Sequence, residues 1–368
     1  MRERRILHVF STFESGGQQV RTCGILNALG RRFTHVVVPT SGSSDAARLI
    51  SPSVRFELMA PPPGKGSMAY AWRFRHLIRT LRPDLVLTYN WGAFDAVLGG
   101  YLAGVCPVLH TEDGFCADEA DGLKHRRVWS RRVVLNRTSG MIVPSRTLAN
   151  IAVKRFGVRP RLVKWIPNGI DTDRFAPRRN DALRHAWGIG SDEVLFGFAG
   201  RLGAEKNLHL AVQALSQANT AKARLALIGD GPCRQDLESH AAKLGVADRV
   251  LFVPRTADIA PLYNAMDVFL LTSRTEQMPL SLLEAMASGL PAICTNVGDC
   301  SEMLSTRDFP YLVPSGDVAR LASALETLAA SPAARVTAGA ANRARVLQQY
   351  KLEEMISAYE RIYETGTV

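Results

Sequence analysis

Ten short apolar runs, each about five residues long, alternate along this chain with longer amphipathic stretches. The runs are continuous and do not alternate apolar with polar residues, which is typical of parallel strands buried on both faces. The predicted strands are 6–10, 35–39, 85–89, 108–110 and 140–143 in the first half, and 195–199, 224–228, 250–253, 268–271 and 292–295 in the second. The amphipathic stretches between them, such as 17–29, 207–217, 236–244 and 280–287, predict helices. This alternation predicts an α/β fold in which helices cover both faces of parallel sheets.

Two such series in succession predict two doubly wound, Rossmann-like domains. A length of 368 residues also exceeds what one ordinary core accommodates. The segment "WIPNGIDTDRFAPRRND", residues 165–181, clusters Pro, Gly and Asp between the two series and predicts the boundary. We therefore expect an N-terminal domain over 1–175 and a C-terminal domain over 176–351. The last helix, within 352–368, is expected to pack back on the first domain.

The charge is distributed unevenly between the two halves. Residues 1–190 hold 29 Lys and Arg against 14 Asp and Glu, whereas residues 191–368 hold 16 against 20. A basic first half indicates an anionic partner, which could be nucleic acid, a membrane surface or a phosphorylated substrate. No apolar run reaches the roughly 18 residues of a membrane-spanning helix, and "MRERRILHVFST" reads as a first strand, not as a signal peptide. Six scattered cysteines without metal-ligand spacing favour reduced thiols and a cytoplasmic location.

Two glycine-containing loops follow predicted strands and precede predicted helices. The first, "ESGGQQVRT", contains Gly16 and Gly17, and the second, "GRLGAEKN", contains Arg201 and Lys206. Backbone at glycine can approach a ligand closely, and a helix N-terminus favours anions. Two cations beside such a terminus suit a diphosphate. Each loop has a plainer interpretation: the first as an ordinary strand-to-helix turn, the second as a pair of solvated surface cations.

The segment "TEQMPLSLLEAMASGLPAICTNVG", residues 275–298, adds two carboxylates. Glu276 lies in the predicted loop, whereas Glu284 lies in a helix whose neighbours are almost all apolar. A buried carboxylate without a partner costs several kcal/mol, so Glu284 is expected to hold something. Ligands of open α/β sheets bind at the carboxyl ends of the strands, so this segment is expected to lie beside Arg201 and Lys206.

The motifs "IPNGIDTDRF", "GRLGAEKN", "EQMPLSLLEAMASGLPAICTNVG" and "YLVPSGD" resemble those of the retaining glycosyltransferases of family 4, which have the GT-B fold. The resemblance covers nearly the whole chain, and its strongest part is the pair of Glu residues separated by seven positions. It implies two Rossmann-like domains facing a central cleft. It also implies a nucleotide-sugar donor held mostly by the C-terminal domain, with no metal or other cofactor.

Carried over residue by residue, the resemblance assigns a role to each motif. Glu284 would accept hydrogen bonds from the ribose hydroxyls, and Arg201 and Lys206 would neutralise the diphosphate. Glu276 and the backbone of the following residues would hold the sugar hydroxyls, while Gly16 and Gly17 would approach the donor from the other domain. The following residues are Gln277, Met278, Pro279 and Leu280, and the nucleobase is expected near Val253 to Arg255.

The chain departs from the common family pattern at two positions. Gln277 stands where many relatives have Gly, which would narrow the sugar pocket. In "LHTEDGF", Asp113 stands where many relatives have a His near the reacting sugar, with His110 three residues upstream. We expect Asp113 to contact the sugar. His110 is left open between pointing into the cleft and acting as a hydrogen-bonded structural histidine at a strand end.

Segments 70–82 and 124–137 interleave arginines with aromatic and apolar residues. They are either ordinary amphipathic helices with a solvated basic face, or a surface that binds an anionic membrane with some arginines also recognising an acceptor phosphate. Loops within 40–70 and 112–130 are expected to supply acceptor contacts. The "DTD" at 171–173 predicts turn and capping residues in preference to a metal site.

Together these features predict a retaining, metal-independent hexosyltransferase that uses a UDP- or GDP-sugar. The acceptor is expected to be a lipid-linked sugar or polysaccharide, in bacterial exopolysaccharide or lipopolysaccharide synthesis at the cytoplasmic face of the membrane. The alternatives are an epimerase or hydrolase of nucleotide sugars with the same fold, and a non-catalytic protein that binds polyanions or membranes. Nucleic acid is not an expected partner. A dinucleotide-dependent oxidoreductase is disfavoured because the GxGxxG fingerprint is missing.

Overall fold

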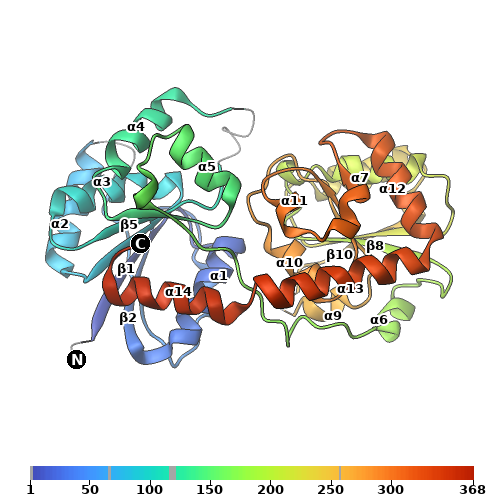
Figure 1. Ribbon diagram of the computed structural model, residues 1–368, viewed down its shortest axis with the longest axis horizontal. Coiled ribbons are helices and arrows are strands. Elements are labelled where there is room, and N and C mark those ends of the chain that lie inside the picture. Colours follow the sequence, from blue (N-terminus) through green and yellow to red (C-terminus); the bar gives the residue numbers. More distant parts are fainter. Residues whose placement is uncertain (1–2, 65–67, 116–121, 257) are drawn as a thin grey trace. The chain divides into compact units, whose positions relative to one another are not determined.

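The computed structural model describes residues 3–64, 68–115, 122–256 and 258–368. The chain forms two compact units, of which the first is Met1–Asn168 with Glu353–Val368 and the second is Gly169–Leu352 (Figure 1). The chain thus leaves the first unit after residue 168, seven residues before the boundary that the sequence predicts. It returns after residue 352.

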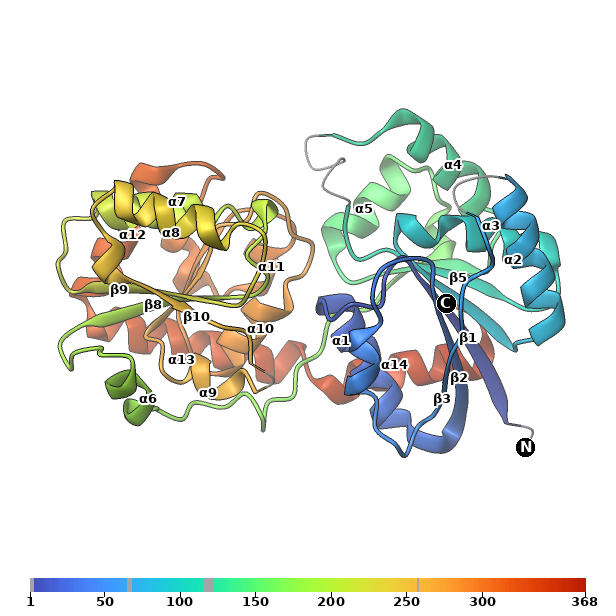
Figure 2. The same ribbon diagram turned by 180° about the vertical axis from the view of Figure 1, so that it is seen from behind.

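The first unit is built on a seven-stranded sheet in the order β3-β2-β1-β4-β5-β6-β7, in which all paired neighbours are parallel. Helices α1 and α14 lie on one face of this sheet and α2 to α5 on the other (Figures 1 and 2). The strands are β1 (Arg4–Phe10), β2 (Phe33–Pro39), β3 (Arg55–Leu58), β4 (Leu85–Tyr89), β5 (Val108–Thr111), β6 (Gly140–Val143) and β7 (Val163–Trp165). The helices are α1 (Gly17–Leu29), α2 (Met68–Leu81), α3 (Phe94–Ala103), α4 (His125–Leu135), α5 (Arg146–Lys154) and α14 (Leu352–Thr365).

The C-terminal helix α14 is part of the first unit although it follows the whole second unit in sequence. Its Tyr363 is fully buried and meets the ring of Phe33 edge-on at 5.5 Å and that of His35 at 5.9 Å. These contacts attach α14 to β2, on the same face of the sheet as α1 (Figure 2).

The second unit contains a six-stranded parallel sheet in the order β10-β9-β8-β11-β12-β13. Helices α7, α8 and α12 cover one face, and α9, α10 and α13 cover the other (Figures 1 and 2). The strands are β8 (Val194–Ala199), β9 (Ala223–Ile228), β10 (Val250–Val253), β11 (Val268–Leu271), β12 (Ala292–Thr295) and β13 (Leu312–Val313). The helices are α6 (Asp181–Ala186), α7 (Leu208–Gln217), α8 (Arg234–Lys243), α9 (Ala260–Tyr263), α10 (Leu280–Ala287), α11 (Cys300–Met303), α12 (Val318–Ala330) and α13 (Pro332–Gln349).

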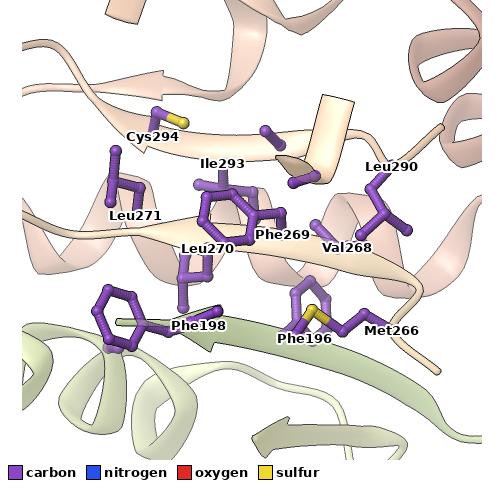
Figure 3. Packing of buried hydrophobic residues seen from close by; sticks show 14 of the residues in the cluster. Phe196, Phe198, Met266, Val268, Phe269, Leu270, Leu271, Leu290, Ile293 and Cys294 are labelled. Carbon is purple, nitrogen blue, oxygen red and sulfur yellow. The ribbon is translucent and has the colours of Figure 1, made fainter. Parts of the chain in front are cut away.

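The core of the second unit explains why its central strand carries a glycine between two phenylalanines. Phe196 and Phe198 of β8 are fully buried beside Phe269 of β11 (Figure 3). A Cβ at Gly197 would lie 2.6 Å from the methyl carbon of Met266, so a larger residue would displace that side chain. Close packing of this kind holds β8 and β11 in register, and their carboxyl ends carry the loops described next.

In both units the direction in which strands are added to the sheet reverses beside the first strand. β1 lies between β2 and β4, and β8 lies between β9 and β11, so the chain extends the sheet first on one side and then on the other. In open α/β sheets the crevice at this point, outside the carboxyl ends of the strands, is the usual binding site. The loops that leave these ends are therefore the place to look for chemistry in each unit.

Candidate functional site

Lys206 and Glu276 meet at the carboxyl edge of the second sheet. The Nζ of Lys206 donates to Oε1 of Glu276 at 2.6 Å, and the hydroxyl of Ser273 donates to the same oxygen at 2.8 Å. The two charged side chains are 21% and 12% exposed, respectively. A charge-assisted bond that is largely shielded from water is stronger than an exposed pair, so the positions of both charges are well defined.

The backbone around Lys206 is held by the strands on either side. Lys206 ends a 3₁₀ turn (Ala204–Lys206), and Asn207 follows with a left-handed φ of 49° before α7 begins. The hydroxyl of Thr272, just after β11, donates to the carbonyl oxygen of Lys206 at 2.9 Å. The chain just after β11 therefore fixes Lys206 through Thr272 and Glu276 through Ser273.

Arg201 is placed differently from Lys206. Its side chain is 67% exposed, and its nearest carboxylate is that of Glu205 at 3.7 Å. An exposed pair of this length contributes little to stability, so the guanidinium is free to reorient. The structure thus brings Lys206 and Glu276 into contact and leaves Arg201 on the surface of the same loop.

The loop after β8 rests on the loop after β9. A Cβ at Gly229 would clash with the carbonyl oxygen of Gly200, and the amide of Leu202 donates to the carbonyl of Asp230 at 3.0 Å. The carboxylate of Asp230 also accepts from the amide of Arg255 at 3.1 Å. Asp230, which the sequence reasoning missed, therefore joins the ends of β8, β9 and β10.

Val253 and Arg255 extend this connection to β10. The carbonyl of Val253 accepts from the amide of Gly229 at 2.8 Å. The residues predicted to lie near the nucleobase and the residues predicted to hold the diphosphate thus follow strands β10 and β8, joined through the loop after β9.

Glu284 of α10 has a partner within the chain. The hydroxyl of Tyr263 donates to its Oε2 at 2.7 Å, and Tyr263 itself is fully buried. Burial raises the pKa of the Glu284 carboxyl, while the Tyr263 hydrogen bond and the charge of Arg174 act in the opposite direction. Tyr263, at the end of α9, is a second residue that the sequence reasoning missed, because nothing in "APLYNAMD" marks its hydroxyl as functional.

The segment between the two glutamates leads directly into α10. Gln277 and Met278 are buried, Pro279 occupies the N-cap position, and Leu280 is the first helical residue. The amide of Asp299 donates to the carbonyl of Gln277 at 2.9 Å, which ties this segment to the loop after β12. Pro279 provides no side-chain cap for α10, and amides at the start of a helix can donate to acceptors on a ligand.

In the first unit, Asp113 lies at the centre of a polar network after β5. Both guanidinium NH groups of Arg21 contact its carboxylate, with Nη2 to Oδ2 at 2.9 Å, and the side-chain amide of Gln18 also donates to it. The amide of Asp113 donates to Oδ1 of Asn90 at 2.8 Å, and Arg21 reaches Oδ1 of Asn168 at 2.9 Å. Asp113 is therefore a charge-paired group whose orientation is set from α1, β4 and the end of the first unit.

Gly16 and Gly17 lie where this network meets α1. Gly16 is the N-cap residue of α1 and Gly17 its first residue. A Cβ at Gly16 would come to 3.0 Å from Oε1 of Gln19, which is tight but not prohibitive. The glycine loop and Asp113 thus belong to one site at the carboxyl edge of the first sheet, connected by Gln18 in the first turn of α1.

His110 lies beneath this site, away from the surface. It is fully buried, with Nδ1 2.8 Å from Thr88 Oγ1 and Nε2 3.4 Å from Oε2 of Glu112. These contacts are those of the hydrogen-bonded structural histidine, the alternative that the sequence left open. Glu112 is also fully buried and accepts from Nε of Arg131 at 3.1 Å.

Arg131 differs from the other arginines of the basic segment 124–137. It is fully buried and its guanidinium lies 4.9 Å from the ring centre of Trp91 and 4.7 Å from that of Phe156. Both interpretations of this segment, a solvated basic face and a membrane-binding surface, place its arginines at the surface, and for Arg131 this is wrong because Glu112 pairs with it in the core. Trp129, two residues earlier, is 65% exposed.

The "DTD" segment and the predicted acceptor loops can also be compared with the structure. Asp171 Oδ1 accepts from the amides of residues 173 and 174, at 3.0 and 2.9 Å, which is the turn predicted for "DTD". Across the described ranges, no group of three or more His, Cys, Asp or Glu is arranged to hold a metal ion. Residues 65–67 and 116–121, within the predicted acceptor loops, lie outside the described residues.

Comparison with known proteins assigns a family model to each half of the chain. Residues 15–174 match the model "Glycosyltransferase Family 4", and residues 193–331 match "Glycosyl transferases group 1". The chain is 28% identical to the UDP-Gal:alpha-D-GlcNAc-diphosphoundecaprenol alpha-1,3-galactosyltransferase of Escherichia coli, over 68% of this chain and 67% of that protein. It is also 28% identical to the 2-deoxystreptamine glucosyltransferase of Streptomyces kanamyceticus, over 68% of this chain and 69% of that protein.

The architecture is likewise shared with solved structures. The crystal structure of Anabaena Alr3699/HepE in complex with UDP-glucose superposes with a TM-score of 0.83. The match covers 99% of this chain and 100% of that one at 21% sequence identity. At this level of identity the likeness shows the fold, with both units included.

Proposed function

This chain belongs to the family 4 glycosyltransferases and has their two-domain GT-B fold, and on that premise we propose that it moves a hexosyl group from a nucleoside diphosphate sugar to a glycan acceptor. The donor is a UDP-sugar or a GDP-sugar, and the anomeric configuration is retained. The reaction uses no metal ion, because Lys206 and Arg201 supply the positive charge that the diphosphate needs.

The observation that carries this proposal is the contact between Lys206 and Glu276, with Glu284 at the end of the same segment. One cation and two carboxylates stand at the carboxyl edge of a single sheet, held by bonds from Ser273, Thr272 and Tyr263. Preorganised charge that faces the place where charge develops is the main source of catalysis in group transfer.

In the proposed reaction, the bond between the anomeric carbon and the diphosphate oxygen breaks while the acceptor hydroxyl attacks from the same face. The hydroxyl proton passes to an oxygen of the departing diphosphate. Lys206 and Arg201 stabilise the negative charge that grows on the diphosphate. Glu276 accepts from the sugar hydroxyls, and Asp113 is proposed as a further contact of the sugar.

The nucleotide is the first point to test. Two observations favour UDP: the Anabaena protein was crystallised with UDP-glucose, and the Escherichia coli relative is named for UDP-Gal. A thermal-shift screen with UDP, GDP, ADP and their sugars separates the possibilities. A nucleotide at a hundred times its dissociation constant stabilises the folded protein by about 2.7 kcal/mol. Stabilisation by none of them would remove the basis of the proposal.

The variants Lys206→Ala and Glu284→Ala test the chemistry. Removal of one group that stabilises developing charge lowers kcat by roughly a hundredfold to a thousandfold, and loss of Glu284 weakens donor binding. Lys222→Ala is a matched control, because that lysine is 64% exposed in the same unit and pairs with Asp192 at 3.5 Å. Full activity in both site variants, with the control also active, would contradict the proposal.

Further measurements address the finer features. The anomeric configuration of the product, read by NMR, tests retention, and full activity after extensive chelation tests metal independence. Incubation with the nucleotide sugar alone distinguishes a transferase from an epimerase or hydrolase, since those enzymes turn over the donor without an acceptor.

For the acceptor, we propose a lipid-linked or polysaccharide glycan of the bacterial cell surface, met at the cytoplasmic face of the membrane. Exposed aromatic side chains on α2, α3 and α4 support this. Those on α2 and α4 belong to the arginine-containing segments 70–82 and 124–137, and α3 packs against both helices. These aromatic residues are Trp72, Tyr101 and Trp129, which are 52%, 42% and 65% exposed. Aromatic rings and cations together favour an anionic lipid surface. No helix among the described residues is long and apolar enough to cross a bilayer, so the attachment we propose is peripheral.

Vesicle flotation tests this attachment. The protein is expected to bind vesicles that contain phosphatidylglycerol, to bind pure phosphatidylcholine weakly, and to lose binding as salt rises. Trp129→Ser is expected to weaken binding, whereas Phe309→Ser is not, although Phe309 is 48% exposed in the second unit. Equal binding by both variants and the unaltered protein would contradict the membrane assignment.

A further inference from the structure

Tyr263 is a buried tyrosine whose hydroxyl points at the carboxylate proposed to hold the ribose. Its hydroxyl donates to Oε2 of Glu284 at 2.7 Å. The other carboxylate oxygen, Oε1, makes no hydrogen bond within the described chain and is not among the buried unpartnered atoms. One oxygen is thus held by the protein while the other stays accessible.

The ring of Tyr263 is fixed by two aromatic neighbours. It meets Phe175 edge-on, with ring centres 6.0 Å apart at 75°, and lies against Phe269 of β11 at 6.0 Å and 46°. Both neighbours are buried. Phe175 ends the "IPNGIDTDRF" motif, so this segment contributes to the site by holding the ring in place.

The same segment brings positive charge toward Glu284. Arg174, beside Phe175, lowers the pKa of the Glu284 carboxyl through its charge. Arg343 of α13 donates to the carbonyl oxygens of Phe175 and Ala287, at 2.8 and 2.7 Å, and so ties the segment to the end of α10. The phenol of Tyr263 stays protonated because burial raises its pKa, so it remains a donor.

We propose that Tyr263 is a positioning residue for nucleotide recognition, which holds the Glu284 carboxylate in one orientation, so that it accepts from a ribose diol and favours ribonucleotides over deoxyribonucleotides. This inference rests on the proposed function, since it takes Glu284 to hold the ribose. Glu284 provides acceptor positions at both oxygens, and the bond from Tyr263 occupies one of those on Oε2. The remaining acceptor positions are those to which two neighbouring hydroxyls of a ribose would donate.

The consequences of losing the hydroxyl follow from the forces on Glu284. Without the Tyr263 donor, burial dominates and the pKa of the carboxyl rises further. The carboxyl is then protonated at a higher pH, and in that form one of its oxygens is no longer a full acceptor. Nucleotide binding is therefore expected to weaken as pH falls in a Tyr263→Phe variant, over a range in which the unaltered protein changes less.

The experiment measures the affinity of UDP and of 2′-deoxy-UDP by calorimetry, with GDP and its 2′-deoxy form in parallel, for the unaltered protein and Tyr263→Phe. We expect UDP to bind Tyr263→Phe about tenfold more weakly, the equivalent of one charged hydrogen bond. We expect 2′-deoxy-UDP to be affected less, so that the preference for the ribonucleotide shrinks. The apparent KM of Tyr263→Phe for the donor should rise as pH falls, while kcat changes little. Tyr311→Phe, in the same unit and also largely buried, is the matched control.

The outcomes separate the inference from the proposed function. Equal losses for UDP and 2′-deoxy-UDP, or no loss, would overturn the role of Tyr263 and leave the glycosyltransferase proposal intact. Failure of the unaltered protein to bind any nucleoside diphosphate would overturn both. If Tyr263→Phe does not fold, Phe175→Leu carries the same test, because it loosens the ring and keeps the hydroxyl, and it should reduce the ribose preference in the same direction.

Discussion

Asp308 is a buried carboxyl whose ionisation is expected to limit the stability of the second unit near neutral pH. It lies in a 3₁₀ turn (Thr306–Tyr311) and is fully buried; its Oδ1 accepts from the amide of Ala292 at 3.2 Å and its Oδ2 from the hydroxyl of Ser305 at 3.1 Å. Burial raises the pKa of Asp308 to about 7 from the ordinary 3.8, in spite of these bonds and of Asn342. The folded state therefore holds a proton that the unfolded chain releases at lower pH.

The direction and size of the effect follow from this difference. Below pH 3.8 both states are protonated and Asp308 has no effect on the pH dependence. As pH rises toward 7, the unfolded state gains from ionisation and the free energy of unfolding falls by about 1.4 kcal/mol per pH unit. The full loss, reached above pH 7, is on the order of 4 kcal/mol. Asp308→Asn removes this titration while retaining an acceptor for Ala292.

Urea unfolding of both proteins between pH 5 and pH 8 measures the effect. The unfolding is monitored by a probe in the second unit, because two domains need not unfold together. We expect the stability of Asp308→Asn relative to the unaltered protein to increase by about 3 kcal/mol across this range and to level off above pH 7. Asp192→Asn, a substitution at a carboxylate that is 70% exposed, should run parallel to the unaltered protein. If the Asp308→Asn curve is also parallel, the carboxyl is ionised in the fold and the reasoning from burial is wrong.

Two further predictions concern the loops and the core. Gly298 has a φ of +55°, and a Cβ there would clash with the carbonyl oxygen of Glu276, so Gly298→Ala should raise the donor KM by about tenfold. Gly245 also has a left-handed φ, of +68°, but a Cβ there would face open space, so Gly245→Ala should leave KM unchanged in the same kinetic assay. Arg131→Met leaves Glu112 buried without its cation and should destabilise the protein by about 3–5 kcal/mol, measured by urea unfolding, whereas a small change would mean that the pair is not desolvated.

Much of the fold could be predicted because its strands are buried on both faces. All ten predicted strands are present, and the predicted helices 17–29 and 280–287 have the observed bounds. The strands that the sequence does not predict are β3, β7 and β13, each of which is an edge strand of its sheet. Edge strands need not be continuously apolar: β3 reads Arg-Phe-Glu-Leu and none of its residues is fully buried. A search for continuous apolar runs therefore passes over them.

The residues of the candidate site also differ in how far the sequence predicts their positions. Lys206 and Glu276 could be predicted to lie together because each follows a strand, and the carboxyl ends of parallel strands share one edge. The burial of His110 could not, because its partners Thr88 and Glu112 lie on a neighbouring strand and just beyond its own. The burial of Arg131 could not be predicted either. Its arginine-rich segment suggests a solvated face, whereas in the structure Arg131 pairs with the buried Glu112.

Glu284 shows why a local pattern can raise a question that only the packed structure answers. Its apolar helix predicts that the carboxylate needs a partner, and a ligand was the natural candidate. The structure supplies a first partner from the chain itself: Tyr263, 21 residues earlier, with its ring held between Phe175 and Phe269. A carboxylate with one oxygen hydrogen-bonded by the protein can be stable before the nucleotide binds. Its other oxygen can still accept a hydrogen bond from the bound nucleotide. The stability of the folded protein and its affinity for the ribose of a nucleotide then depend on the same Tyr263 hydroxyl, so Tyr263→Phe should lower both. Thermal unfolding of the variant and of the unaltered protein, with and without UDP, measures the two effects together.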